Sequence, residues 1–235
     1  SNISKKTKII FISHVTSSTA LIFPVKQISE LAKKHNIFCI IDGAHAPAYL
    51  DLDIDKIDCD VYVGACHKWM CSPKGVSFLY VKKEYQNIID PLVVSWGYES
   101  EFPGKSKFLD YHQWQGTRDM SAYLTIPTTI DFLKKYNWNK ITSECREINL
   151  WARDEINQML NKKALCKTKF LGQMSSIYIK KEATIDYHIY FYKKYKIQIP
   201  FILWNNISFI RISIQAYNTK EDIYKLLDAL KKEML

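Results

Sequence analysis

The sequence predicts an α/β fold, in which a mostly parallel sheet with covering helices is followed by a small C-terminal α+β domain. Two observations indicate this fold class. In the first half, short apolar runs typical of buried strands flank an amphipathic helical segment, and strand–helix–strand units of this kind form right-handed crossovers in parallel sheets. In the second half, helical periodicity comes first and strand-like runs follow. We therefore divide the chain into domains 1–137 and 138–235.

Four buried strands are expected in the first half. They are Ile9–Ile12, Ile37–Asp42, Asp60–Gly64 and Val76–Val81. A helix separates the first two, because Pro24 suits the first position of a helix. Val25, Ile28 and Leu31 then fall on one face at helical spacing. The helix is expected to end near Asn36.

The second half begins with two predicted helices. The first covers residues 126–133 and the second, a long one, covers residues 141–159, where apolar residues recur at helical spacing. Three strands are expected next, at Ser176–Ile179, Ile197–Ile202 and Phe209–Gln215. Thr219 and Asp222 form a capping box that begins a last amphipathic helix.

Composition and charge limit the class of protein. The chain has 235 residues, enough for one large domain or slightly more, and no apolar run is long enough to cross a bilayer. The net charge of +9 comes from lysines scattered in pairs, which we interpret as a solvated surface. The six cysteines lie mostly in apolar runs, which is typical of reduced thiols. We expect a cytoplasmic protein that binds neither nucleic acid nor membrane.

Polar residues follow three of the predicted strands. These clusters are His14–Thr19, Asp42–His45 and Cys66–Lys68. In parallel α/β sheets, ligands bind beyond the carboxyl ends of the strands. We therefore expect the three clusters to meet at one edge of the sheet and to form a site there.

The segment CHKWMCSPKG, residues 66–75, is compatible with three kinds of chemistry: metal binding, a nucleophilic cysteine or a reactive lysine. A metal would need a second pair of ligands beside Cys66, His67 and Cys71, and no such pair occurs at zinc spacing. A nucleophilic cysteine would need an activating neighbour, whereas apolar neighbours favour the thiol. We therefore expect no metal, and lysine chemistry at Lys68 fits best.

Lys68 can form a Schiff base with a carbonyl group, including the aldehyde of pyridoxal phosphate. That cofactor withdraws electrons only while its ring nitrogen is protonated, which requires a neighbouring carboxylate. Asp42, at the end of a predicted strand, can supply this carboxylate. Taken alone, each residue also fits a plainer role, as a surface lysine or a strand-ending cap. Their placement on one edge favours the chemical role.

Five segments carry a resemblance to a known family. They are SHVTSSTALIFPV (13–25), IIDGAHAPAYLDLDI (40–54), GACHKWMCSPKGVSFLYV (64–81), QWQGTRDMSAYLTIPTTIDFL (113–133) and FIRISIQAYNTKEDI (209–223). The chain resembles the class V aminotransferases, which are fold-type I pyridoxal-phosphate enzymes, and within them the isopenicillin N epimerase-like branch. The resemblance implies the C-terminal part of the family's large cofactor domain followed by its small domain, with the N-terminal part of the cofactor domain lacking.

The resemblance implies a role for each matching residue near the cofactor. Lys68 resembles the Schiff-base lysine, and Asp42 resembles the partner of the pyridine nitrogen. His45 resembles the residue beside the phenolic oxygen of the cofactor, and Ser17 matches a position near the same edge. His67 resembles a residue that contacts the phosphate.

Three further residues match the family. Gly116 and Thr117 resemble the segment that reaches the phosphate of the neighbouring subunit, which implies a homodimer with shared active sites. Arg211 resembles the arginine that binds the α-carboxylate of the amino-acid substrate. The strand pattern agrees, because Ile210 and Ile212 alternate onto one face and leave Arg211 on the other. A guanidinium placed there suits bidentate carboxylate binding, although a solvent-facing arginine would fit the same pattern.

The resemblance implies an enzyme acting at the α-carbon of an amino acid, as an epimerase, aminotransferase or lyase. Cysteine desulfurases of this class need a cysteine shortly before the carboxylate-binding arginine. Residues 197–211 contain none, so we expect no desulfurase. The alternative is a catalytically inactive fragment, or one subunit of a split protein, that acts as a dimerisation or binding module. A separate chain could then supply the N-terminal segment.

Overall fold

The first sheet has four strands. The computed structural model describes residues 2–235. The strands are β1 (Ile9–Ser13), β2 (Phe38–Asp42), β3 (Val61–Ala65) and β4 (Ser77–Val81), in the order β1-β2-β3-β4. The first three pair in parallel, and β4 pairs antiparallel to β3. The predicted mostly parallel sheet is therefore confirmed.

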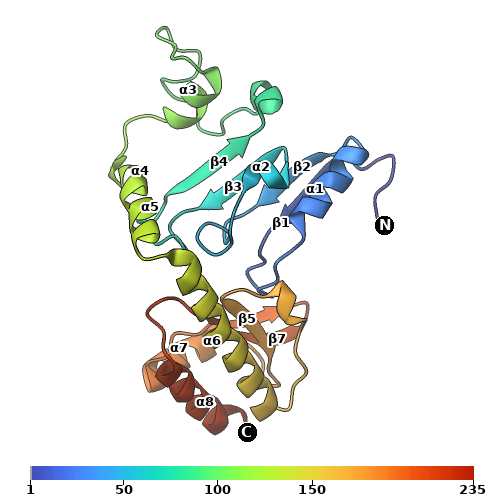
Figure 1. Cartoon of the computed structure of the whole chain (residues 1–235), viewed down its shortest axis with the longest axis vertical. Coiled ribbons are helices and arrows are strands. Elements are labelled where there is room, and N and C mark those ends of the chain that lie inside the picture. The colour runs from blue at the N-terminus through green and yellow to red at the C-terminus, as the bar shows by residue number, and fades with distance from the viewer. Residues whose placement is uncertain (1) are drawn as a thin grey trace.

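Helices cover one face of this sheet and continue the chain beyond it (Figure 1). They are α1 (Val25–Lys34), α2 (Ile54–Ile57), the 3₁₀ helix Lys83–Ile88, α3 (Lys107–Gln113), α4 (Ser121–Leu124) and α5 (Ile126–Lys135). α1 forms where it was predicted, with Pro24 just before it, and it buries Val25 and Ala32 in a core shared with Cys39 and Ile41 of β2. This packing holds β2 in the middle of the layer.

The prediction that β1 is a buried strand is wrong for one of its faces. Ile10 and Ile12 pack in the core with α1, whereas Ile9 and Phe11 are 57% and 68% exposed. β1 is an edge strand, and no other part of residues 2–235 buries these two side chains. An apolar run predicts a strand, but burial of both faces needs a second layer that the run does not specify.

The second sheet is antiparallel and lies in the last part of the chain. Its strands are β5 (Met174–Tyr178), β6 (Phe201–Trp204) and β7 (Ile207–Ser213), in the order β5-β7-β6. Ile177 and Ile210 form its core together with residues of α6 (Trp138–Met159) and α8 (Lys220–Met234). α8 begins with the predicted capping box, in which the Thr219 N–H donates to Asp222 Oδ2 at 3.1 Å.

Apart from shifts of up to three residues at the ends of α6, β5 and β7, two features of this second unit differ from the prediction. The strand expected at 197–202 begins only at Phe201, because Pro200 has no N–H and the carbonyl of Ile199 accepts from His188 Nδ1 at 2.7 Å. α7 (Ile185–Tyr195) was not predicted. Its aromatic and β-branched residues favour strands by propensity, and the helix forms because Thr184 caps it and Phe191 is buried against the second sheet.

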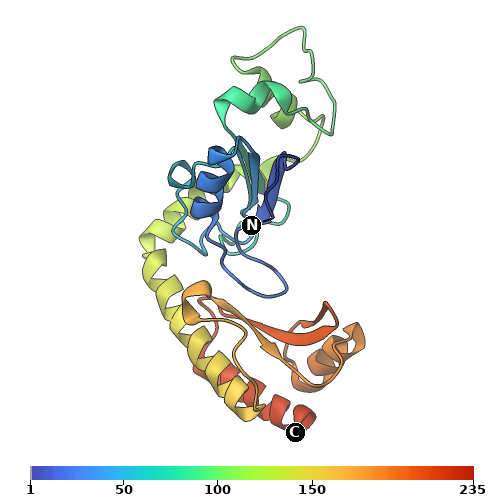
Figure 2. The same cartoon turned by 90° about the vertical axis from the view of Figure 1, so that its right-hand side faces the viewer.

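The two sheets are connected by hydrogen bonds as well as by the chain itself, in which α6 follows α5 and runs along the second sheet (Figure 2). The Met174 N–H donates to Tyr49 Oη at 3.2 Å, and Ser176 Oγ donates to the carbonyl of Ser18 at 2.8 Å. α6 begins at Trp138, and the domain boundary at residue 137 stays a prediction. Within residues 2–235, no helix has both the length and the apolar character needed to cross a membrane.

Candidate active site

The carboxyl ends of β1, β2 and β3 lie at one edge of the first sheet. Parallel pairing places Ser13 beside Asp42, and Asp42 beside Val63. Beyond the strands, the His14 N–H donates to the carbonyl of Asp42, and the Gly43 N–H donates to the carbonyl of Val63, each at 2.8 Å. The chain segments that follow the three strands therefore start from the same edge, as the sequence predicted.

A buried pair of side chains, His14 and Tyr62, lies beneath this edge of the sheet. His14 Nδ1 and Tyr62 Oη are 2.8 Å apart. Burial lowers the pKa of His14 to about 4, so that its ring is neutral at pH 7. Tyr62 passes directly below Gly43, where an added Cβ atom would lie 2.1 Å from the tyrosine ring. Glycine is therefore required in the turn that follows Asp42.

Lys68 lies in a tight turn between β3 and β4. The turn is closed by the Cys66 N–H, which donates to the carbonyl of Val76 at 3.0 Å, and by the Ser72 N–H, which donates to the carbonyl of Cys66 at 3.0 Å. The Lys68 side chain is exposed. Its Nζ lies 3.4 Å from His45 Nε2, so the structure brings these two predicted residues together.

His45 occupies the centre of the cluster. Its Nδ1 accepts a hydrogen bond from Trp69 Nε1 at 3.1 Å, while its Nε2 faces Lys68. The pKa of His45 is lowered to about 4, mainly by burial and further by the positive charges of Lys68 and Arg211. Asp42 acts in the opposite direction and raises this pKa. These three charged residues therefore all act on one imidazole ring.

Asp42 is half-buried at the end of β2. Its Oδ1 accepts from the Ala44 N–H at 2.9 Å, which fixes the carboxylate against the following turn. Within residues 2–235, the second carboxylate oxygen has no hydrogen-bond donor. A carboxylate held in this way keeps one acceptor available for a ligand.

Arg211 reaches the site from β7 of the second sheet. Its Nη1 donates to the carbonyl of Ser17 at 2.7 Å and to Ser17 Oγ at 3.0 Å. The structure thus brings two predicted residues together from opposite sheets. Burial lowers the pKa of Arg211, and its Nε is buried without a hydrogen-bond partner among residues 2–235. An unpaired buried N–H costs free energy unless an acceptor is supplied.

His67 is half-buried beside the lysine turn. Its Nδ1 lies 3.0 Å from the carbonyl oxygen of Val76. A carbonyl only accepts, so Nδ1 carries the proton and donates. In the neutral ring, Nε2 is therefore an acceptor, and it becomes a donor only when the ring is protonated.

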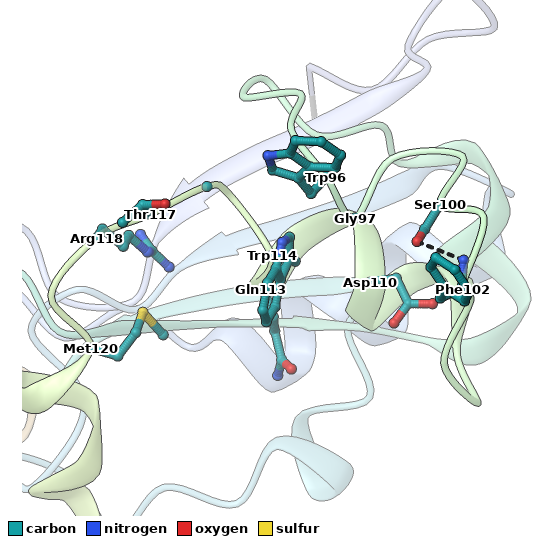
Figure 3. Close-up of a pocket in the computed structure, with 11 residues that line it drawn as sticks. Trp96, Gly97, Ser100, Phe102, Asp110, Gln113, Trp114, Thr117, Arg118 and Met120 are labelled. Atoms are coloured by element: carbon teal, nitrogen blue, oxygen red, sulfur yellow. Dashed lines mark hydrogen bonds between the residues drawn. The ribbon is translucent and has the colours of Figure 1, made fainter.

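Gly116 and Thr117 lie in a different place. They line a cavity of about 860 Å³ in the segment between β4 and α4, together with Trp96 and Trp114 (Figure 3). Gly116 has a φ of +96°, a backbone conformation that favours glycine. Among residues 2–235, no hydrogen bond joins Gly116 or Thr117 to Lys68, but the flanking residues Gln115 and Arg118 line a second cavity together with Ala44 and Ala65.

Three residues of this site were not predicted from the sequence: Gly43, Tyr62 and Trp69. Tyr62 is 48 positions away from His14 along the chain, and only the packing of β1 and β3 on either side of β2 brings them together. Trp69 is adjacent to Lys68, and an indole N–H beside a predicted Schiff-base lysine is a signal that could have found it. Gly43 could have been found from its place directly after a strand-ending carboxylate.

Comparison with known families and proteins identifies the family of this chain. The family model "Aminotransferase class-V" matches residues 1–226. The chain is 29% identical to isopenicillin N epimerase of Amycolatopsis lactamdurans and 32% identical to that of Streptomyces clavuligerus, over 97% and 96% of its length. It is also 28% identical to a probable cysteine desulfurase of Halalkalibacterium halodurans. The chain belongs to the class V aminotransferase family, and its relatives include two members of the isopenicillin N epimerase-like branch.

Solved structures show the same fold. The apo cysteine desulfurase of Thermococcus onnurineus NA1 superposes with a TM-score of 0.81 at 15% identity, over 98% of this chain and 60% of that one. This likeness confirms the fold-type I assignment. The chain also spans about 60% of the length of the two curated epimerases it matches.

The two buried histidines predict a pH dependence of stability. The pKa of both His14 and His45 falls from 6.5 to about 4 on folding. Below pH 6.5 the unfolded chain therefore binds protons that the folded chain does not. Above pH 6.5 these two groups should not affect the free energy of unfolding. Between pH 6.5 and 4 we expect the free energy of unfolding to fall as the pH falls. Each histidine contributes at most about 1.4 kcal/mol for each unit by which folding lowers its pKa.

Urea unfolding at several pH values across this window measures the effect. The His14→Gln/His45→Gln double variant is the comparison, because glutamine does not titrate. The variant should lose most of the slope between pH 6.5 and 4. An equal slope in the wild type and the double variant would show that other groups cause it.

Proposed function

We propose that this chain contributes the active site of a pyridoxal-phosphate enzyme that acts at the α-carbon of an amino acid. The observation that supports this is the approach of Lys68 Nζ to His45 Nε2, at 3.4 Å, on the edge of the sheet where β2 ends in Asp42. Membership of the class V aminotransferases, a family that uses pyridoxal phosphate, supports the same cofactor. When bound, this cofactor supplies an electron sink for the α-carbon.

The residues at this edge fit the cofactor. The exposed amine of Lys68 can hold it covalently, and the second oxygen of Asp42 can accept the N–H of its ring. His45 faces the lysine with a nitrogen available to the phenolic oxygen, and His67 lies on the same turn for the phosphate. Lys68, Asp42 and His45 therefore match groups of the cofactor, whereas His67 would donate to the phosphate only when its ring is protonated.

Lys68 is also the group that moves the proton. Once its amine is free, it can remove the proton from the substrate α-carbon, because an amine is a competent general base. We propose epimerisation, in which a proton is removed from one face of the α-carbon and a proton is added to the other. The similarity to two isopenicillin N epimerases supports this reaction.

Desulfurase chemistry is not part of this proposal, although cysteine desulfurases are among the relatives. That reaction needs a cysteine thiol in the segment before Arg211, and residues 197–211 contain none. Two of the cysteines nearest the site, Cys66 and Cys71, have a pKa raised by burial. A raised pKa keeps a thiol protonated and makes it a weaker nucleophile.

Arg211 is proposed to bind the substrate carboxylate. Its Nη1 is held by Ser17, which fixes the plane of the guanidinium. Its Nε is buried and unpaired, and a carboxylate would supply the missing acceptor. Arginine binds carboxylates with two parallel hydrogen bonds, which positions the α-carbon as well as holding it.

One face of the first sheet carries exposed apolar side chains, which supports the proposal that a further polypeptide segment packs on it. Ile9 and Phe11 of β1 and Leu79 of β4 are exposed apolar side chains on strands. Sheets with parallel strands are normally covered by helices on both faces. We propose that a further polypeptide segment packs on this face, either in the same protein or as a separate chain, and that full activity depends on it. Without that segment, the chain would act as a binding module.

Lys68→Ala tests the proposed function. After incubation with pyridoxal phosphate and reduction with borohydride, we expect the wild-type chain to carry the cofactor on the peptide that contains Lys68. The variant should carry none there. Mass spectrometry of the digested protein locates the label. Lys74→Ala is the matched control, because Lys74 is an exposed lysine at the end of the same loop. Labelling spread evenly over surface lysines, or absent, would favour the binding module.

Replacing Arg211 tests carboxylate binding. We expect Arg211→Gln to lower the second-order rate of α-proton exchange roughly 10- to 150-fold, the equivalent of charge-assisted hydrogen bonds worth about 1.5–3 kcal/mol. The exchange rate of Arg211→Lys should lie between those of the wild type and Arg211→Gln, because lysine keeps the positive charge and lacks the paired N–H donors of the guanidinium. Exchange is measured in deuterated water by mass spectrometry on a panel of L- and D-amino acids. A rate that is unchanged in Arg211→Gln would remove the arginine from the substrate site.

We also propose that the segment between β4 and α5 forms a homodimer interface. Its exposed apolar side chains include Leu92, Trp96, Phe102, Trp114 and Leu124. A cluster of this kind beside a cavity marks an interaction surface. A second copy of the chain is the proposed occupant, because Gly116 and Thr117 of this segment resemble residues that complete the neighbouring subunit's site.

Trp96→Lys tests the dimer. The indole is 81% exposed, so the substitution should not disturb the fold, whereas a buried lysine would destabilise the interface. We expect sedimentation velocity to show a dimer for the wild type and a shift toward monomer for the variant. Tyr217→Lys, at a side chain that is 78% exposed outside this segment, is the control. A wild-type chain that stays monomeric at high concentration would contradict the proposal.

A further inference from the structure

Trp69 is buried directly behind His45. Its side chain is 7% exposed, and its ring packs on Tyr49 with ring centroids 4.8 Å apart. Its Nε1 lies 3.1 Å from His45 Nδ1. An indole nitrogen carries a hydrogen and is only a donor. Nδ1 of His45 must therefore be the acceptor, and it carries no proton in this arrangement.

This contact determines the tautomer of His45. A neutral imidazole has one protonated and one unprotonated nitrogen, so a ring with an unprotonated Nδ1 carries its proton on Nε2. Nε2 is the nitrogen that faces Lys68 Nζ at 3.4 Å. We propose that Trp69 is a positioning residue that holds His45 as the Nε2–H tautomer, so that His45 presents a hydrogen-bond donor to the Lys68 side of the site.

The charged surroundings of His45 are consistent with a neutral ring. Lys68 and Arg211 face it with positive charge and Asp42 with negative charge, and burial acts together with the two cations to lower its pKa to about 4. Protonation would have to occur at Nδ1, where it would break the bond from Trp69 and place two N–H groups against each other. Trp69 therefore opposes proton uptake in addition to selecting the tautomer.

A donor at this position has a specific consequence for Lys68. An ammonium group has three donors and no acceptor, so it cannot accept a hydrogen bond from His45 Nε2–H. The free amine can. The Nε2–H group can therefore donate a hydrogen bond to Lys68 Nζ only when Lys68 is a neutral amine. The same donor suits the phenolic oxygen of pyridoxal phosphate. This last role rests on the proposed function, whereas the tautomer itself does not.

The experiment is nitrogen-15 NMR of the imidazole rings in the full chain without cofactor. The His45 resonances are assigned by their loss in His45→Gln. We expect wild-type His45 to show an unprotonated Nδ1 and a protonated Nε2. In Trp69→Phe, which removes the donor, we expect a mixture of tautomers and a titration midpoint that rises, because Nδ1 can then take up a proton without breaking a hydrogen bond. Trp138→Phe is the matched control, because this tryptophan donates to the carbonyl of Ala48 and not to His45.

A second variant keeps the test valid if Trp69→Phe does not fold. Incorporation of 3-benzothienylalanine at position 69 keeps the ring shape and replaces the N–H with sulfur. A change of tautomer in this variant supports the proposal. A protonated Nδ1 in the wild type, or a tautomer unchanged in the benzothienyl variant, overturns it. Because the measurement needs no cofactor, its result is independent of the Lys68 labelling experiment, and failure of one can be told from failure of the other.

Discussion

The parallel register of β1, β2 and β3 is the constraint on which the site depends. Because Ser13, Asp42 and Val63 lie side by side at the carboxyl ends of their strands, the segments that follow must leave the sheet at one edge. The backbone bonds from His14 and Gly43 extend this alignment past the last paired residues. Asp42 is thereby held at the edge by the sheet itself, and His45 follows only three residues later.

The second sheet contributes Arg211 to the site at the edge of the first sheet. In β7, Ile210 and Ile212 are buried in the core with α6 and α8, and alternation along the strand leaves Arg211 on the opposite face. From there its guanidinium reaches Ser17, which follows β1. The bond between Tyr49 and Met174 joins the same two units, and Met174 lies on β5, the strand paired with β7. The site is therefore an interface between the two sheets, and packing in the second unit sets where the arginine points.

The sequence predicted the parts of this arrangement that local pattern encodes. Short apolar runs located β1 to β4 to within about a residue, and helical spacing located α1, α6 and α8, because core burial imposes those periods directly. Contacts between distant residues could not be predicted in this way. The His14–Tyr62 pair and the exposure of Phe11 both depend on which layers pack together. The residue types at positions 42, 45 and 68 were informative because their chemistry is rare in combination, whereas the contact of Trp69 with His45 depends on the fold.

The three residues His67, Lys68 and Trp69 show how one turn can set the chemistry of its neighbours. His67 Nδ1 faces the carbonyl of Val76 and must donate, so its Nε2 is an acceptor in the neutral ring. His45 Nδ1 faces the Trp69 N–H and must accept, so its Nε2 is a donor. The Nε2 atoms of these two histidines therefore have opposite hydrogen-bonding roles beside one lysine. The difference comes from the groups that contact each Nδ1 and not from the histidines themselves. A lysine amine next to the donor can accept from it, and a phosphate near the other ring would gain a donor only when that ring takes up a proton. The order of residues in this turn thus assigns separate tasks to two identical side chains.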